Sequence, residues 1–446
     1  MIEILVISLL ILCVFSYIIM DKDLSSPSLL YTGGFFMCSI GAYMYRYEWG
    51  LGLHKNTCLL IILGAISFII TEFVCRMNYK QAKPIINVSA APVINIKNYK
   101  LILFVGFQLL IYYLLVRYKF AQSVGATSIG ESIGDVSQRS KIEHENLYFP
   151  WYIQYPYQMC RDAGFIWICL FSYYFHKPKR YRIKKWLIGL NLMVCIVVGG
   201  YVSGGRMPFL GYLIPLFIFL YTFKMYKQNW NSRTIPLKTV FIIAITAIIF
   251  VTSFVQVGNL MGRKESESTN SYVLSIYCGA QIKNLDDFLN NPLKTKNTHW
   301  GGYTFNTLYK DFNKNASKNY SDYDMSSLFN TYRGYPLGNV YTCYYHYYYD
   351  FKMGGLICVI VMSFLLSSLN NRIHYTNFFK TGELNLGVLL YASFISAAFL
   401  SFFSESFYSK IGCVALIKSF VFWLLIKIYL QGFKNKIITF GKKRIL

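Results

Sequence analysis

Apolar segments of about 16–22 residues recur from end to end of this 446-residue chain, and each can cross a hydrocarbon core about 30 Å thick. Charged residues make up only 14% of the chain, whereas soluble proteins carry about 25%. We therefore predict an all-α, polytopic integral membrane protein with about eleven transmembrane helices, within a range of about 10–12. The predicted helices span residues 2–20, 29–46, 57–76, 100–117, 155–175, 186–203, 207–223, 239–257, 353–369, 384–403 and 411–430.

The basic residues predict the orientation of these helices. Lys and Arg cluster in connections such as 176–185 and 224–233 and in the tail 434–446, and short basic connections mark the cytoplasmic side. This clustering accounts for the net charge of +24, and with no basic face or nucleic-acid motif we expect no nucleic acid partner. By alternation the N-terminus lies outside. The chain then divides into a bundle of helices 1–8 with the external loop 118–154 (1–257), a large external loop (258–352), and helices 9–11 with a basic cytoplasmic tail (353–446).

The large loop, about 95 residues long, far exceeds the usual helix–helix connection of about 2–8 residues. Twelve of the twenty Asp and Glu residues lie in 118–154 and 258–352. The large loop is also rich in Tyr, Phe, Trp and Leu, which a disordered segment would lack. We expect it to form short helices packed on the outer face of the membrane.

One arginine lies between two apolar runs. In VVGGYVSGGRMPFLGYLIPL (197–216), Arg206 follows two glycine pairs and precedes Pro208, a composition that indicates a tight or partly unwound link where backbone can line a cavity. Arg206 could be an interfacial residue whose charge reaches water. It could also bind an anion, because a guanidinium is a planar fork suited to phosphate oxygens.

Other external arginines could converge with Arg206 on one polyanion. Arg333 lies in TYRGYPLGNVYT (331–342), Arg139 in the first external loop, and Arg161 near the outer start of the fifth predicted helix. Each of them alone is more often a solvated charge.

The aromatic run YTCYYHYYYDF (341–351) enters the ninth predicted helix. An interfacial aromatic belt explains it, but aromatic rings also stack on sugars, and we assign this role to Trp300, Tyr335 and Tyr341. His346 and Asp350 are four residues apart and share a helix face, so they could be a catalytic base and the carboxylate that orients it. Because no His, Cys, Asp and Glu spacing fits a metal, we expect no metal and no cofactor.

Together with this architecture, three short segments resemble a known family. They are the SGGR turn (203–206), YRGYPLGNVYT (332–342) and DFKMGG (350–355). The chain resembles the Wzy-type O-antigen polymerases, which are oligosaccharide repeat-unit polymerases of bacterial surface polysaccharides. The resemblance implies a GT-C-like helical bundle in the bacterial inner membrane, a large periplasmic loop containing short helices, and essential periplasmic arginines.

The resemblance also implies a reaction at the periplasmic face. A growing glycan passes from undecaprenyl pyrophosphate to a new lipid-linked repeat unit, with a chain-length regulator protein as a further partner. Arg206, Arg333, Arg161 and Arg139 would bind the pyrophosphate. An O-antigen ligase and a lipid-linked oligosaccharide flippase remain alternatives, although a flippase would place charges inside the bundle and have short loops.

Overall fold

The computed structural model describes residues 1–80, 94–142, 149–202, 207–227, 270–291, 300–312, 330–375, 384–411 and 414–432. Within these ranges the protein is mostly helical and has one antiparallel two-stranded hairpin, which confirms the predicted all-α character. Ten of the eleven predicted helices coincide with helices of the structure, and the range 239–257 lies outside the described residues.

Six helical stretches of the described chain are long and apolar enough to cross a membrane. They are Ile2–Ile19, Lys55–Tyr79, Asn98–Gln122, Lys179–Gly200, Tyr344–His374 and Val414–Gln431. Two shorter apolar helices cover Phe209–Met225 and Leu386–Leu400. The apolar helices identify an integral membrane protein, and the count of about eleven spans stays a prediction.

The described chain contains long helices, short helices and two strands. They are α1 (Ile2–Ile19), α2 (Pro27–Met44), α3 (Lys55–Lys80), α4 (Asn98–Gln122), α5 (Ile129–Ile142), α6 (Trp151–Phe175), α7 (Arg182–Ile196), α8 (Met207–Lys227), α10 (Asn270–Tyr277), α11 (Ala280–Asn290), α12 (Asn306–Phe312), β1 (Asn330–Tyr332), β2 (Tyr335–Gly338), α13 (Tyr344–Phe351), α14 (Leu356–Tyr375), α15 (Leu386–Leu400) and α16 (Val414–Gln431).

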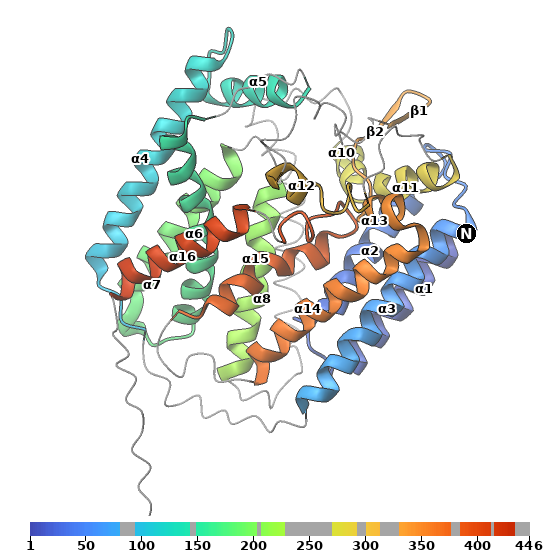
Figure 1. Ribbon diagram of the computed structural model, residues 1–446, viewed down its shortest axis with the longest axis horizontal. Coiled ribbons are helices and arrows are strands. Elements are labelled where there is room, and N and C mark those ends of the chain that lie inside the picture. The colour runs from blue at the N-terminus through green and yellow to red at the C-terminus, as the bar shows by residue number, and fades with distance from the viewer. Residues whose placement is uncertain are drawn as a thin grey trace, which may run out of the picture.

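The long helices form two groups joined at the centre (Figure 1). Helices α1, α2, α3 and α14 pack together on one side, and α4, α6, α7 and α16 on the other. Between them, α15 packs on α2, α6, α8 and α14, so the two groups form one bundle.

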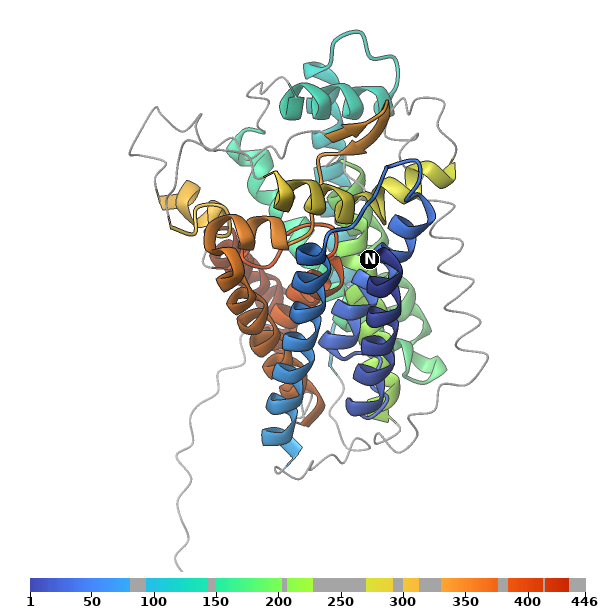
Figure 2. The ribbon, with the colours of Figure 1, turned by 90° about the vertical axis from the view of Figure 1, so that its right-hand side faces the viewer.

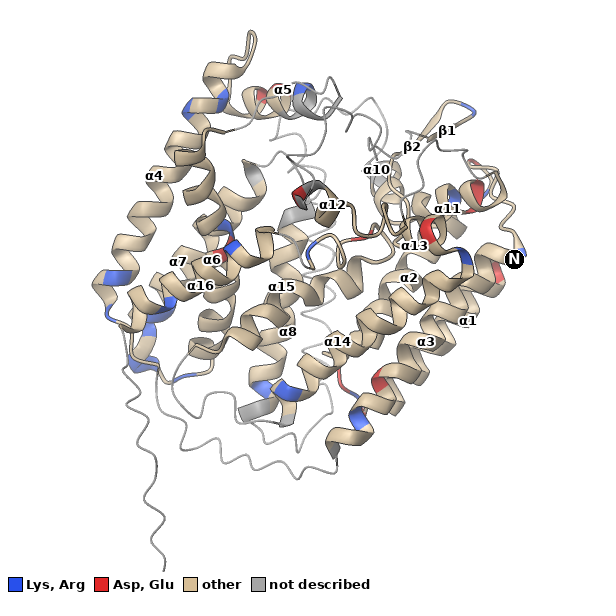
Figure 3. Ribbon diagram, in the orientation of Figure 1, with Lys and Arg blue, Asp and Glu red and all other residues tan. Residues whose placement is uncertain are grey.

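The short elements gather at one end of this bundle, as Figures 1 and 2 both show. This end is called the cap here and consists of α5, α10, α11, α12, the β-hairpin, α13 and the segment 300–305. Figure 3 shows Lys and Arg at the opposite end, around the ends of α7, α8 and α14. The predicted topology therefore puts the cap outside and the basic end inside.

Helix α1 shows why a membrane is needed around the bundle. Its Leu5 and Leu9 are fully buried, while Ile7, Ile11 and Ile18 are each more than half exposed. A helix that is apolar on its exposed face as well as its buried face is suited to lipid rather than water.

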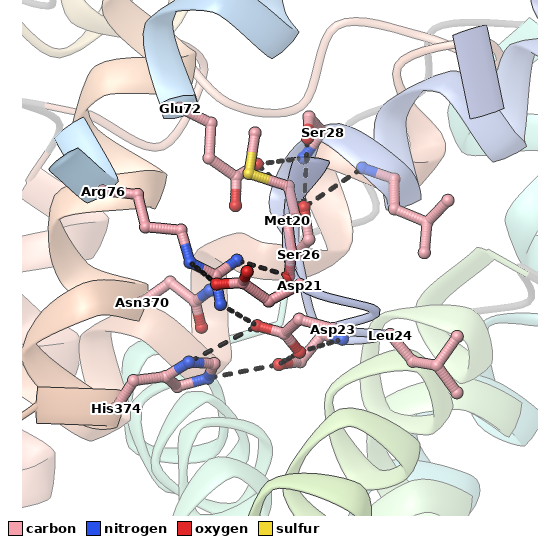
Figure 4. A network of polar contacts seen from close by, with 12 residues as sticks. Met20, Asp21, Asp23, Leu24, Ser26, Ser28, Glu72, Arg76, Asn370 and His374 are labelled. Atoms are coloured by element: carbon pink, nitrogen blue, oxygen red, sulfur yellow. Dashed lines mark hydrogen bonds and ion pairs between the residues drawn. The ribbon is translucent and has the colours of Figure 1, made fainter. Parts of the chain in front are cut away.

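A buried polar network at the basic end ties α1 and α2 to α3 (Figure 4). On α3, Glu72 accepts hydrogen bonds from Ser28 N at 2.6 Å and from Ser26 Oγ at 3.0 Å, both at the start of α2. One turn further along α3, Arg76 Nη1 donates to the carbonyl of Met20, 2.8 Å away at the end of α1. The Glu72 carboxylate thus binds the positive N-terminal end of α2, and the Arg76 guanidinium binds the negative C-terminal end of α1. The helix dipoles favour both contacts.

Two further groups complete this network. Asp23 Oδ2 lies 3.6 Å from Arg76 Nη2 and 3.4 Å from His374 Nδ1 on α14. Asp21 Oδ2 lies 3.8 Å from Arg76 Nε. We call Asp21, Asp23, Glu72, Arg76 and His374 the polar clamp, and all but Asp21 are buried.

Candidate functional site

Arg161 lies within α6, among Tyr157 of the same helix, Cys195 of α7 and Tyr212 of α8. Its Nε is 3.8 Å from Asp162 Oδ1, and 42% of its side chain is exposed. Among the described residues no other carboxylate lies within ion-pair distance of this guanidinium. The guanidinium is thus partly exposed and lies near one carboxylate, and its predicted role as a phosphate-binding arginine stays a prediction.

Asp162 is held in place by α16. Ser419 Oγ donates a hydrogen bond to Asp162 Oδ2 at 2.7 Å, and Trp423 Nε1 donates to the Asp162 carbonyl at 2.9 Å. These two bonds fix α16 against α6, with Lys418 next to Ser419. Lys418 Nζ lies 4.9 Å from the centre of the Tyr155 ring of α6.

A third cation comes from the connection 401–411 between α15 and α16. Lys410 Nζ donates to the Ser393 carbonyl at 3.2 Å, and its charge acts on Asp162 together with that of Arg161. We call Arg161, Lys410 and Lys418 the cationic cluster. All three side chains are partly exposed, and the charges of Arg161 and Lys410 both act on Asp162. Guanidinium and ammonium groups of this kind are suited to an anionic ligand.

The cap contacts two of the elements that carry the cationic cluster. Asp311 Oδ2 of α12 accepts a hydrogen bond from Val414 N, the first residue of α16, at 2.8 Å. The Phe305 ring lies 5.4 Å from that of Tyr408, which belongs to the same connection as Lys410. The aromatic segment 300–312 is thus joined to both elements that supply lysines.

His346 and Asp350 of α13 do not form the predicted base–orienter pair. Asp350 Oδ1 and Oδ2 instead accept hydrogen bonds from the backbone N–H groups of Tyr303 and Thr304, at 3.2 and 2.6 Å. The carboxylate fastens the segment 300–305 to α13, because both of its oxygens are used by that segment. The Nδ1 of His346 is buried and has no hydrogen-bond partner among the described residues, so no carboxylate orients the imidazole.

The described arginines do not converge as expected. Arg139 of α5 donates to the Gln122 carbonyl at 2.9 Å and lies 3.6 Å from Asp135. Arg333 is at the exposed tip of the hairpin, with φ +47° and its guanidinium 5.3 Å from the Tyr332 ring centre. The hairpin and α6 lie on opposite sides of the molecule in Figure 1. Arg206 lies outside the described residues.

The three predicted sugar-stacking residues differ in exposure. Trp300 is 75% exposed and packs against Phe305 and Phe351 with ring centres 6.4 and 5.2 Å apart. Tyr335 is partly exposed at the hairpin, whereas Tyr341 is buried against Tyr345. Trp300 is therefore the predicted residue that is both exposed and joined to the segment beside the cationic cluster.

The sequence reasoning missed Lys410 and Lys418. A lysine within the predicted helix 411–430 was a usable signal, because ionisable residues inside membrane spans are rare and tend to be functional. Lys410 gave no such signal, since it lies in a short connection where a basic residue is unremarkable. Among the described residues no three His, Cys, Asp or Glu side chains gather in a group that could hold a metal ion.

A contact between a histidine and a carboxylate does occur where α11 of the cap meets the start of α3. His54 Nδ1 lies 2.9 Å from Oδ2 of the buried Asp286 of α11, and Asp286 Oδ1 accepts hydrogen bonds from His54 N and Thr57 Oγ1 at 3.0 and 2.5 Å. Asp286 thereby caps the start of α3. Helix α11 lies on the other side of the bundle from α6 (Figure 1), so this pair does not belong to the cationic cluster.

No protein-family model, curated protein or solved structure matches this chain. The family resemblance therefore stays a prediction, and the function has to be inferred from the cationic cluster and the cap.

Proposed function

We propose that this chain is a membrane-embedded glycosyltransferase of the Wzy type, which polymerises oligosaccharides carried on undecaprenyl pyrophosphate. The observation that carries the proposal is the cationic cluster, three basic side chains on α6, α16 and the connection 401–411, of which the last two elements contact the aromatic segment of the cap. A lipid-linked sugar combines the same features, since it has an apolar tail, a diphosphate and sugar rings.

The chemistry of the transfer explains why fixed cations would accelerate it. As the bond between the sugar C1 and the diphosphate oxygen breaks, negative charge grows on the leaving diphosphate. Preorganised positive groups stabilise that charge more in the transition state than in the ground state. Arg161 offers two parallel N–H donors, and Lys410 and Lys418 act as point charges. Trp300 would stack on a sugar, and Arg206 remains a predicted ligand of the diphosphate.

The test replaces Arg161 in cells that lack the native protein, followed by analysis of surface polysaccharide length. We expect Arg161→Ala to leave single repeat units on the lipid core, because losing one such donor lowers the rate about 10²–10³-fold. Arg161→Lys should give short chains, since it keeps the charge but not the fork. The matched control is Arg46→Ala, because Arg46 forms an ion pair with the half-exposed Glu3. This variant should give full-length chains. Full-length chains from Arg161→Ala would remove the cluster from the mechanism.

A second candidate function is transport of the same lipid-linked oligosaccharide across the membrane. The polar clamp favours it, because charges buried in a helical bundle are expected of a flippase. The same experiment separates the two candidates, since a transport defect leaves no repeat unit on the lipid core, whereas a polymerase defect leaves single units. A ligase defect also leaves none. We favour the transferase because Glu72 and Arg76 of the clamp already bind helix ends, whereas Arg161 of the cationic cluster is partly exposed.

A further inference from the structure

Glu405 lies in the connection 401–411 and is held by its own turn. Its Oε1 accepts hydrogen bonds from Phe407 N at 2.7 Å and from Tyr408 N, and its Oε2 accepts one from Ser409 N at 3.1 Å. An ionised carboxylate has about four acceptor positions. Three backbone amides and the Ser409 side chain therefore fix the group in one orientation.

Two buried hydroxyl groups near Glu405 have no hydrogen-bond partner among the described residues. They are Oη of Tyr347, on α13, and Oγ of the adjacent Ser406. Tyr347 is 1% exposed, and the charge of Glu405 acts on it directly. Because buried polar groups are nearly always paired, these hydroxyls point to a polar ligand, and sugar hydroxyls have the matching donors and acceptors.

Glu405 also lies in the connection that links the two parts of the proposed site. Lys410 of the cationic cluster belongs to the same connection. Tyr408 packs against Tyr347 of α13 and Phe305 of the cap, with ring centres 5.7 and 5.4 Å apart. The connection that carries Glu405 therefore both supplies one proposed diphosphate ligand and contacts the aromatic segment that would hold sugars.

Burial raises the pKa of Glu405 to about 7. Four groups from the packed elements interact with its charge, namely Cys343, Tyr347, Cys358 and Tyr408. Asp350 also acts on Cys358, and Lys410 is the cation of the same connection. A base works best when its pKa lies near the working pH.

We propose that Glu405 is the catalytic base of the transfer reaction, an inference that rests on the proposed function. Its carboxylate takes the proton of the acceptor hydroxyl while that oxygen forms a bond to C1 of the donor sugar. The bond from C1 to the diphosphate oxygen breaks, and its electron pair leaves with the diphosphate held by the cationic cluster. Glu405 then returns the proton to water. His346 is less suited, because no carboxylate orients its ring.

The test uses the full-length purified protein in lipid vesicles with a defined undecaprenyl-pyrophosphate oligosaccharide, and measures turnover against pH. For the unsubstituted protein, turnover should fall as the pH drops below about 7, since only the deprotonated carboxylate accepts a proton. Glu405→Gln should lower kcat about 10²–10⁴-fold and abolish this pH dependence, with little change in KM. Glu405→Asp should be slower than the native protein and keep the pH dependence.

Glu131→Gln is the matched control, because Glu131 of α5 also accepts backbone N–H groups of its own turn, from Thr127 and Ser128, and has no assigned proton transfer. It should keep the pH dependence and most of the turnover. Equal losses in Glu405→Gln and Glu131→Gln, or a native pH profile in Glu405→Gln, would assign Glu405 a structural role and overturn the inference. If the unsubstituted protein transfers no glycan at all, the proposed function itself fails, and this inference fails with it.

Discussion

At the scale of single residues, Arg76 has the clearest structural role. It is buried, donates a hydrogen bond to the end of α1, and faces the carboxylates of Asp21 and Asp23. Because Asp23 is also buried, removing Arg76 leaves a carboxylate without its main counter-charge in a place that water hardly reaches.

We therefore expect Arg76→Met to lower the free energy of unfolding by about 3–5 kcal/mol, the usual effect of breaking a buried ion pair from one side. Arg46→Met serves as the control, because its partner Glu3 is half exposed and such pairs contribute about 0–1 kcal/mol. Denaturant unfolding of both variants in mixed micelles measures the difference. A loss below about 1 kcal/mol for Arg76→Met would show that the polar clamp does not stabilise the helix ends.

The residues of the proposed site differ in how far sequence could reveal them. Arg161 was predictable, since a cation at the outer part of an apolar helix is unusual. Lys410 and Glu405 were not assigned to the site, because their roles depend on the packing of α6, α13, α16 and the connection 401–411. Asp350 differs from its prediction. Helical spacing puts it on one face with His346, but it accepts hydrogen bonds from the backbone N–H groups of Tyr303 and Thr304.

At the scale of elements, two glycines of α2 have opposite environments. A Cβ on Gly41 would lie 2.0 Å from the carbonyl oxygen of Cys278, so α2 and the α10–α11 connection touch through their backbones. A Cβ on Gly33 would have no neighbour within 4 Å. The first glycine permits the cap to dock on the bundle, and the second only weakens the helix.

Alanine should accordingly act in opposite directions at the two positions. We expect Gly41→Ala to destabilise the protein by about 1–3 kcal/mol through overpacking. Gly33→Ala should stabilise it by up to about 1 kcal/mol through helix propensity. Unfolding free energies in the same micelles provide the comparison, and a Gly41→Ala variant as stable as Gly33→Ala would contradict the backbone contact between α2 and the cap.

Elements were the most predictable level of this structure. Ten predicted helices coincide with helices because long apolar runs alone specify them. The positions of the cap elements could not be predicted, since α11, α12 and the hairpin are short and their positions depend on partners far away in the chain. The hairpin turn did carry a local signal, because Arg333 and Gly334 both adopt positive φ and a glycine in a short loop favours such turns.

At the scale of the whole molecule, the account requires the cap and the basic end to lie on opposite sides of the membrane. The positions of Lys and Arg predict that the basic end is cytoplasmic. The proposed transfer uses lipid-linked oligosaccharides on the outer leaflet, so the cap must be outside.

Labelling by a membrane-impermeant maleimide tests this claim most directly. Trp300→Cys places a thiol in the cap, and Arg180→Cys places one at the basic end, both at exposed positions; the native chain measures background from its own cysteines. In cells with a permeabilised outer membrane, Trp300→Cys should react at once, and Arg180→Cys only after the inner membrane is opened. The reverse pattern would put the cap in the cytoplasm and contradict a transfer reaction on the outer leaflet.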